Sequence, residues 1–83
     1  MDKVLVEVYV PAAEKEYDVL LPLESKLYEV VYLLSGTMTE LSQGHFSATA
    51  DTILCDRRDG AILNINQTVE ENGLANGTKL MLI

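Results

Sequence analysis

The residues that could do chemistry are few in this chain of 83 residues. His45 is the one histidine and Cys55 the one cysteine; the neighbours of His45 supply neither acid nor base, and Cys55 has only the arginines of a following turn nearby. Nucleophilic catalysis needs a thiol or hydroxyl beside a base that a third group orients. One imidazole and one thiol also cannot fill a tetrahedral metal site, and the carboxylates show no ligand spacing. We therefore expect no enzyme activity, no metal site and no cofactor.

The single cysteine indicates the compartment as well. Cys55 cannot form a disulfide within the chain, which fits a reducing cytoplasm, and a structural role is more common for such a thiol than a reactive one. The N-terminal residues do not resemble a secretory signal. The longest nearly apolar stretch, Val30–Leu34, is far shorter than the ~20 residues of a membrane span. We expect a cytoplasmic protein that does not insert into the membrane.

The charges indicate which partners to expect. Six Lys and Arg against thirteen Asp and Glu give a formal net charge of −7. Nucleic-acid binding needs clustered basic residues, so no nucleic-acid partner is expected. Arg57 and Arg58 stand between Asp56 and Asp59, which is more typical of a solvated turn than of an anion site.

The first part of the chain has the pattern of a β-hairpin. Lys3–Val10 alternates between one face with four valines and another face with Leu5 and Tyr9, which predicts a strand. The segment 11–15 contains a proline and is short enough for a hairpin loop. Glu16–Leu21 alternates again and is expected to be the second strand.

A helix is expected next, from about Lys26 to about Ser42. Ser25 is a suitable N-cap for it, and Gly44 or Gly36 could end it. Its apolar residues recur at helical spacing and predict one buried stripe. They are Leu27, Val30, Val31, Leu34, Met38 and Leu41.

The second half of the chain contains shorter strands. We expect a loop at 43–51, a strand at 52–55, a turn at 56–60, a brief strand at 61–63 and a last strand at 78–83. In the last strand Leu80 and Leu82 face one side, while Met81 and Ile83 face the other. One helix covering one apolar face of a sheet gives a two-layer α+β domain over residues 1–83, with the last strand beside the first.

The end of the chain, Thr68–Ile83, together with the hairpin and the helix, resembles the ubiquitin-like β-grasp. The segment Asn72–Ile83 is most similar to the YukD/EsaB family of small bacterial ubiquitin-like proteins associated with type VII (WXG-type) secretion. This resemblance implies a mixed sheet of four to five strands with one main helix on one face. It also implies a non-catalytic accessory or regulatory component that binds a protein partner, such as a membrane component or ATPase of the machinery, at the inner face of the membrane.

Ubiquitin and the sulfur carriers of the same fold end in a Gly-Gly tail, whose carboxylate is adenylated and transferred. The sequence ends at Ile83 in the expected last strand without such a tail. Carrier or conjugation chemistry is therefore not expected. The alternative function is a ubiquitin-like interaction domain of an unrelated assembly, and the genes beside this one would distinguish the two.

Two surfaces could bind a protein. The first is the sheet face turned away from the helix, where apolar residues would form a patch, either for a partner or for a homodimer. Its expected members are Leu5, Tyr9, Leu54, Met81 and Ile83. The second is the pair Tyr28 and Tyr32 on the helix, whose rings either bury at the margin of the sheet or face a partner.

Overall fold

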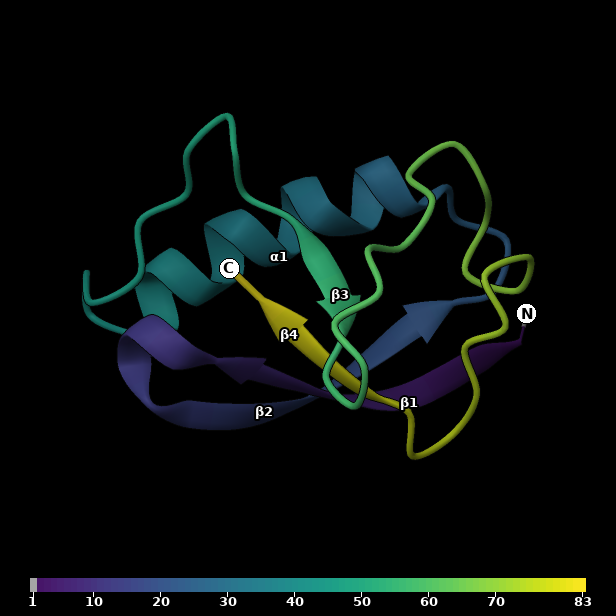
Figure 1. Cartoon of the computed structure of the whole chain (residues 1–83), viewed down its shortest axis with the longest axis horizontal. Helices are drawn as coiled ribbons and strands as arrows, with labels where there is room; N and C mark the ends of the chain where they lie inside the picture. Colours follow the sequence, from purple (N-terminus) through teal and green to yellow (C-terminus); the bar gives the residue numbers. More distant parts are fainter. Residues whose placement is uncertain (1) are drawn as a thin grey trace.

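The computed structural model describes residues 2–83, so Met1, which belongs to the expected domain, lies outside the described residues. Within that range the chain forms four strands, one α-helix and one short 3-10 helix (Figure 1). In chain order these are β1 (Lys3–Val10), η1 (Pro11–Ala13), β2 (Lys15–Pro22), α1 (Leu27–Leu41), β3 (Leu54–Asp56) and β4 (Lys79–Leu82). The helix lies against one face of the sheet, and the sheet order is β2-β1-β4-β3.

The sheet is mixed, as expected for a β-grasp. Strand β1 pairs antiparallel with β2 and parallel with β4, and β4 pairs antiparallel with β3. The predicted α+β class, the hairpin and the neighbouring first and last strands are confirmed. The predicted brief strand at 61–63 is reduced to one isolated bridge, between Ile62 and Cys55.

The β1–β2 hairpin follows from the valine alternation in β1. Val4, Val6, Val8 and Val10 are all buried, so a shift of one residue would turn every valine to solvent. The chain reverses through η1, after which Glu14 adopts a left-handed conformation with φ of 52°. This conformation closes the loop before β2 begins.

The start of α1 differs from the prediction. Lys26, not Ser25, is the N-cap, and its side chain makes no capping hydrogen bond to the helix; its Nζ donates to the Asn66 carbonyl at 3.2 Å. A distant loop supplies the acceptors instead, because the amides of Leu27 and Tyr28 donate to the carbonyls of Gln67 and Ile65 at 2.9 and 3.1 Å. The first amides of every helix lack an acceptor within the helix. Here the carbonyls of Ile65 and Gln67 accept hydrogen bonds from two of them.

The end of α1 supports the longer helix of the two that the sequence allowed. Gly36 lies inside it, and the chain leaves the helix after Leu41. The amide of Gln43 donates to the Glu40 carbonyl and the amide of Gly44 to the Thr39 carbonyl, while both residues have positive φ. This is a Schellman-type ending, so the predicted termination at Gly44 is confirmed within one residue.

The hydrophobic core lies between α1 and the inner face of the sheet. The helix contributes Leu27, Val30, Leu34 and Met38, but Leu41, predicted for the same stripe, is exposed. Loops complete the core with residues that carry no periodic signal. These are Phe46, Val69 and Leu74.

Candidate functional site

The outer face is the side of the sheet turned away from α1. Tyr9 and Met81 face each other across the β1–β4 pair, and both are half-buried. Ile83 follows Met81 by one alternation, is 48% exposed, and exchanges two backbone hydrogen bonds with Ile53. The structure therefore brings together three of the five predicted patch residues. We call Tyr9, Met81 and Ile83 the Tyr9 cluster.

Leu5 lies on the same face but away from the Tyr9 cluster. It is four residues before Tyr9 on β1, about 13 Å along the strand. Between them is Glu7, which pairs with Lys79 of β4 at 3.9 Å from Oε2 to Nζ. A row of charge thus divides the predicted patch into two parts.

Leu5 has its own neighbour, which was not among the predicted patch residues. Leu20 of β2 lies directly opposite Leu5 and is 60% exposed. The signal was available, because Leu20 alternates with the inward residues of β2 and the hairpin register places it against Leu5.

Leu54 was predicted on the outer face, and this is wrong. Its side chain is 2% exposed and belongs to the core, because Leu54 pairs with Leu82 on the inner face. The residue of β3 that shares the outer face with Met81 is Cys55. The β3 segment is so short that its own pattern fits either orientation, and the pairing with β4 decides.

Cys55 is buried, although it lies on the outer side of β3. It sits between β4 and the segment at Ile62, and its Sγ is 3.5 Å from the Met81 carbonyl oxygen. Burial raises the pKa of the Cys55 thiol, and the charges of Asp56 and Asp59 raise it further. A thiol with a raised pKa is a poor nucleophile, which agrees with the expected structural role.

Arg57 borders the Tyr9 cluster and was not predicted as part of it. Its guanidinium carbon lies 4.2 Å from the centre of the Tyr9 ring, and its Nη1 forms an ion pair with Glu16 of β2. The hydrogen bond from Arg57 lowers the pKa of Glu16, and Glu16 in turn raises the pKa of Arg57. The cluster therefore combines apolar side chains with the Arg57–Glu16 ion pair at its border. Aromatic residues, Met and Arg are enriched at protein-binding surfaces.

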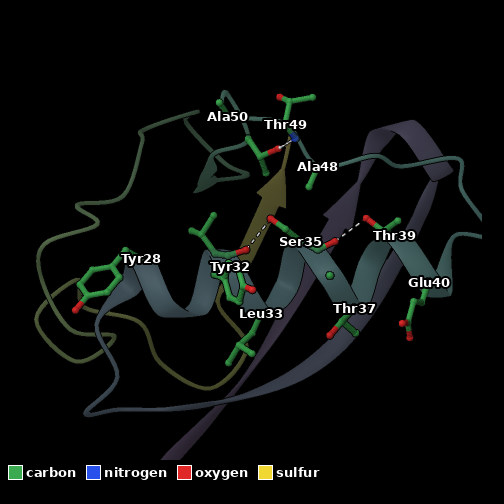
Figure 2. A pocket seen from close by; sticks show the side chains of 13 residues that line it. Tyr28, Tyr32, Leu33, Ser35, Thr37, Thr39, Glu40, Ala48, Thr49 and Ala50 are labelled. Atoms are coloured by element: carbon green, nitrogen blue, oxygen red, sulfur yellow. Dashed lines mark hydrogen bonds between the residues drawn. The ribbon is translucent and has the colours of Figure 1, made fainter.

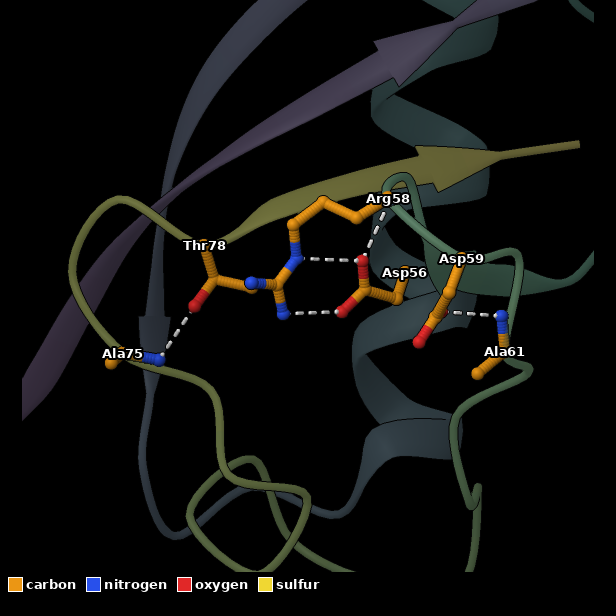
Figure 3. Close-up of polar contacts among 6 residues, drawn as sticks. All are labelled: Asp56, Arg58, Asp59, Ala61, Ala75 and Thr78. Carbon is orange, nitrogen blue, oxygen red and sulfur yellow. Dashed lines mark hydrogen bonds and ion pairs between the residues drawn. The ribbon is translucent and has the colours of Figure 1, made fainter.

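The other charged residues of the 56–60 turn, apart from Arg57, form hydrogen bonds within the turn or to the residue after it (Figure 3). Arg58 donates from its backbone amide and Nε to Asp56 Oδ1, at 2.8 and 3.3 Å, and from Nη2 to Oδ2 at 3.1 Å. These bonds lower the pKa of Asp56. Asp59 accepts a hydrogen bond from the Ala61 amide at 2.9 Å. This arrangement supports the solvated-turn reading over an anion site.

The helix surface is the second candidate. Tyr28 is 53% and Tyr32 is 79% exposed, so the expectation that their rings bury at the sheet margin is wrong. An open groove of about 830 Å³ runs beside them between α1 and the loop at 48–52. Figure 2 shows Ala48, Thr49 and Ala50 across the groove from Ser35. The hydroxyls of Ser35 and Thr39 both donate to helix carbonyls at 2.7 Å, so neither is free to donate to a ligand.

Neither a metal cluster nor a membrane-spanning helix occurs in the described part of the chain. Residues 2–83 contain no group of three or more His, Cys, Asp or Glu side chains placed to hold a metal ion. Over the same residues, no helix combines the length and the apolar character needed to cross a bilayer.

Comparison with known proteins rests on structure, because no family model and no curated protein sequence matches this chain. The chain is similar over 100% of its length to the ubiquitin-like domain of the type VII secretion system protein EccD1 of Mycobacterium tuberculosis, with a TM-score of 0.62, 17% identity and 99% of that chain covered. It is similar to a chain of the MycP5-free ESX-5 inner membrane complex, with a TM-score of 0.71 and 22% identity over 100% of this chain, but it spans only 21% of that chain.

Ubiquitin itself has a similar structure. The ubiquitin of Caldiarchaeum subterraneum matches with a TM-score of 0.73 and 16% identity, over 99% of this chain and 92% of that chain. Identities at this level establish a shared fold and no more. One helix on a mixed sheet of four strands, matched along the whole chain, means that this protein has the ubiquitin-like β-grasp fold.

Proposed function

We propose that this chain is a non-catalytic ubiquitin-like module that binds a protein component of a type VII secretion system. Its place of action would be the cytoplasmic side of the membrane, where it would sit through a partner such as a membrane component or an ATPase. The observation that carries the proposal is the Tyr9 cluster, an apolar surface bordered by the Arg57–Glu16 ion pair on the sheet face that the helix leaves uncovered.

The type of partner is argued from the similar structures. Two of the three structures described above belong to secretion machinery, one as a separate ubiquitin-like domain and one within an inner membrane complex. The sequence resemblance of Asn72–Ile83 to YukD/EsaB proteins supports the same association. The net charge of −7 favours partners with a basic surface, because complementary charge speeds encounter and suppresses wrong pairs.

A second candidate is a ubiquitin-like interaction domain of an unrelated assembly. Its support is the match to an archaeal ubiquitin, which has a TM-score as high as that of the secretion-system chains. In this case the Tyr9 cluster would still be the contact surface, and only the partner would differ.

The test is affinity purification from solubilised membranes of the native host, with mass spectrometry of the bound proteins. Wild-type chain is expected to retain components of a type VII secretion complex. Met81→Glu is expected to lose them by about tenfold or more, because a carboxylate at an apolar contact is desolvated without a partner. Tyr32→Glu is the matched control on the helix and should retain them.

Three results would change the proposal. Recovery of an unrelated assembly would favour the second candidate. If only Tyr32→Glu loses the secretion components, the contact surface is on the helix. Recovery of only the chain itself, as a dimer that Met81→Glu disrupts, would replace the partner by a second copy.

A further inference from the structure

The two edges of the sheet differ in how their backbone groups are used. At the β3 edge, the Asp56 amide donates to the Ala61 carbonyl at 2.9 Å, and the Leu63 amide donates to the Leu54 carbonyl at 3.2 Å. The segment 61–63 therefore covers this edge. At the other edge, β2 has β1 on one side, and no strand among residues 2–83 pairs with its other side.

The register shows which backbone groups of β2 point outward. The Leu23 amide donates to the carbonyl of its opposite residue, Asp2, at 3.1 Å, so this is a hydrogen-bonded pair. Hydrogen-bonded and non-bonded pairs alternate in an antiparallel ladder. Consequently Leu21, Val19 and Tyr17 bond to β1.

The intervening residues of β2 turn their backbone groups away from β1. Glu16, Asp18 and Leu20 direct both amide and carbonyl outward, while Pro22 stands at an outward position where an amide hydrogen would have no partner. β2 is eight residues long, so this is a long free edge for a small domain.

A groove of about 390 Å³ lies beside this edge, between β2 and α1. Val19 and Leu21 line it from the strand, and Leu33, Thr37 and Leu41 line it from the helix. Leu33 and Leu41 are both exposed to solvent. An extended chain added to β2 would point alternate side chains into this groove and the others toward the outer face.

The charges of the edge select the occupant. The side chains of Glu16 and Asp18 are acidic, and a second copy of this chain would bring the same acidic edge. Glu16 is already paired with Arg57, whereas Asp18 forms no ion pair among residues 2–83, so Asp18 is the carboxylate left for a ligand. Acidic side chains on an edge strand also discourage association between identical edges. A strand with basic residues on one face has the complementary charge.

We propose that the β2 edge binds an extended peptide segment by strand addition, with apolar side chains in the β2–α1 groove and Lys or Arg opposite Asp18. This binding mode does not depend on the proposed secretion role. Its backbone contacts are on the free side of β2, whereas Met81 and Ile83 lie on β4 and just beyond it. The two surfaces adjoin at Glu16, which lies opposite Tyr9.

The probe is a blocked synthetic peptide of alternating valine and lysine, equal in length to β2 at eight residues. It is titrated into the labelled protein and followed by amide chemical shifts at physiological salt. The largest shifts are expected at Glu16, Asp18 and Leu20. A second peptide has the same side chains and charges, but every amide is N-methylated. It should bind at least about tenfold more weakly, because it has no amide hydrogen to donate.

Charge variants complete the test. Asp18→Lys should weaken binding by about tenfold, while Asp51→Lys, which makes the same charge change on the loop beyond α1, should leave it within about twofold. Equal binding of the N-methylated peptide would show charge attraction without strand addition and overturn the proposal. The absence of shifts at β2 would overturn the proposal and show that this edge does not bind such a peptide. The same shifts on concentrating the protein alone would overturn it in favour of a second copy of the chain.

Discussion

The two faces of the sheet use the same strands for different purposes. Leu80 and Leu82 of β4 are fully buried in the core, whereas Met81 and the following Ile83 face outward and remain partly exposed. β1 shows the same division, with buried valines on one side and Leu5 and Tyr9 on the other. The inner face therefore carries the stability of the domain, and the outer face keeps apolar surface that the fold does not need.

The arrangement of polar groups differs between the faces as well. Ion pairs cross the outer face, from Lys79 to Glu7 and from Arg57 to Glu16, and they divide its apolar residues into small groups. The inner face has one buried side-chain oxygen without a partner among the described residues, the hydroxyl of Tyr17. Substitutions should accordingly have large effects on stability inside and small effects outside.

The largest effect on stability is expected for Leu80→Ala. Leu80 is completely buried in the core, so truncation should cost about 2–5 kcal/mol of the free energy of unfolding, from lost burial and a residual cavity. A domain of this kind has a total of about 5–15 kcal/mol. Denaturant unfolding followed by circular dichroism measures it. An unchanged midpoint would mean that the faces of β4 are inverted.

Leu54 shows why one site residue was predicted wrongly. A strand of three residues has no alternation long enough to orient it, and a shift of one residue moves every side chain to the other face. β1 could be predicted with its observed bounds because four alternating valines leave one orientation. The partner of Tyr9 could not be predicted, because Arg57 is 48 positions away and only the packing of β3 beside β4 brings it there.

The start of the helix makes the same point about local and distant signals. Ser25 is a good N-cap by residue type, yet the first helix amides donate to carbonyls of the 65–67 loop instead. The sequence left the helix end open between Gly36 and Gly44, because both glycines are possible terminators. The observed reversal begins one residue before Gly44, at Gln43, which also has a positive φ.

A smaller effect of opposite sign is expected for Gly36→Ala. Gly36 lies inside α1, and a Cβ built on it would meet nothing within 4 Å. Alanine should therefore stabilise the domain by about 0.5–1 kcal/mol. Thermal unfolding beside wild type measures the change. A lower melting temperature would indicate that the backbone at this position is not that of a regular helix.

The ion pairs of the outer face should appear as a modest dependence of stability on pH. The pKa of Glu16 is lowered in the folded state by Arg57, so its contribution is present above the ordinary value near 4.5 and is lost as pH falls through the lower folded pKa. As the pH is lowered from 5, the free energy of unfolding should therefore fall less for Glu16→Gln than for wild type. Melting curves across this range compare the two, and parallel profiles would show that the pair contributes nothing in solution.

The smallest effect on stability is expected for Met81→Glu. Its side chain is partly exposed on the outer face, so the free energy of unfolding should change by no more than about 0.5 kcal/mol. Circular dichroism and thermal melting check it. Unfolding of this variant would show that the outer side of β4 is part of the core.

We propose that a protein partner contacts the outer face of the sheet at the Tyr9 cluster. The most direct measurement is photo-crosslinking in the native host, with benzoylphenylalanine in place of Met81 in one variant and in place of Tyr28 in another. We predict a crosslink from position 81 to a component of a type VII secretion complex, and none from position 28. A crosslink from position 28 to such a component, with none from position 81 in folded protein, would show that the partner binds the helix and not the outer face of the sheet.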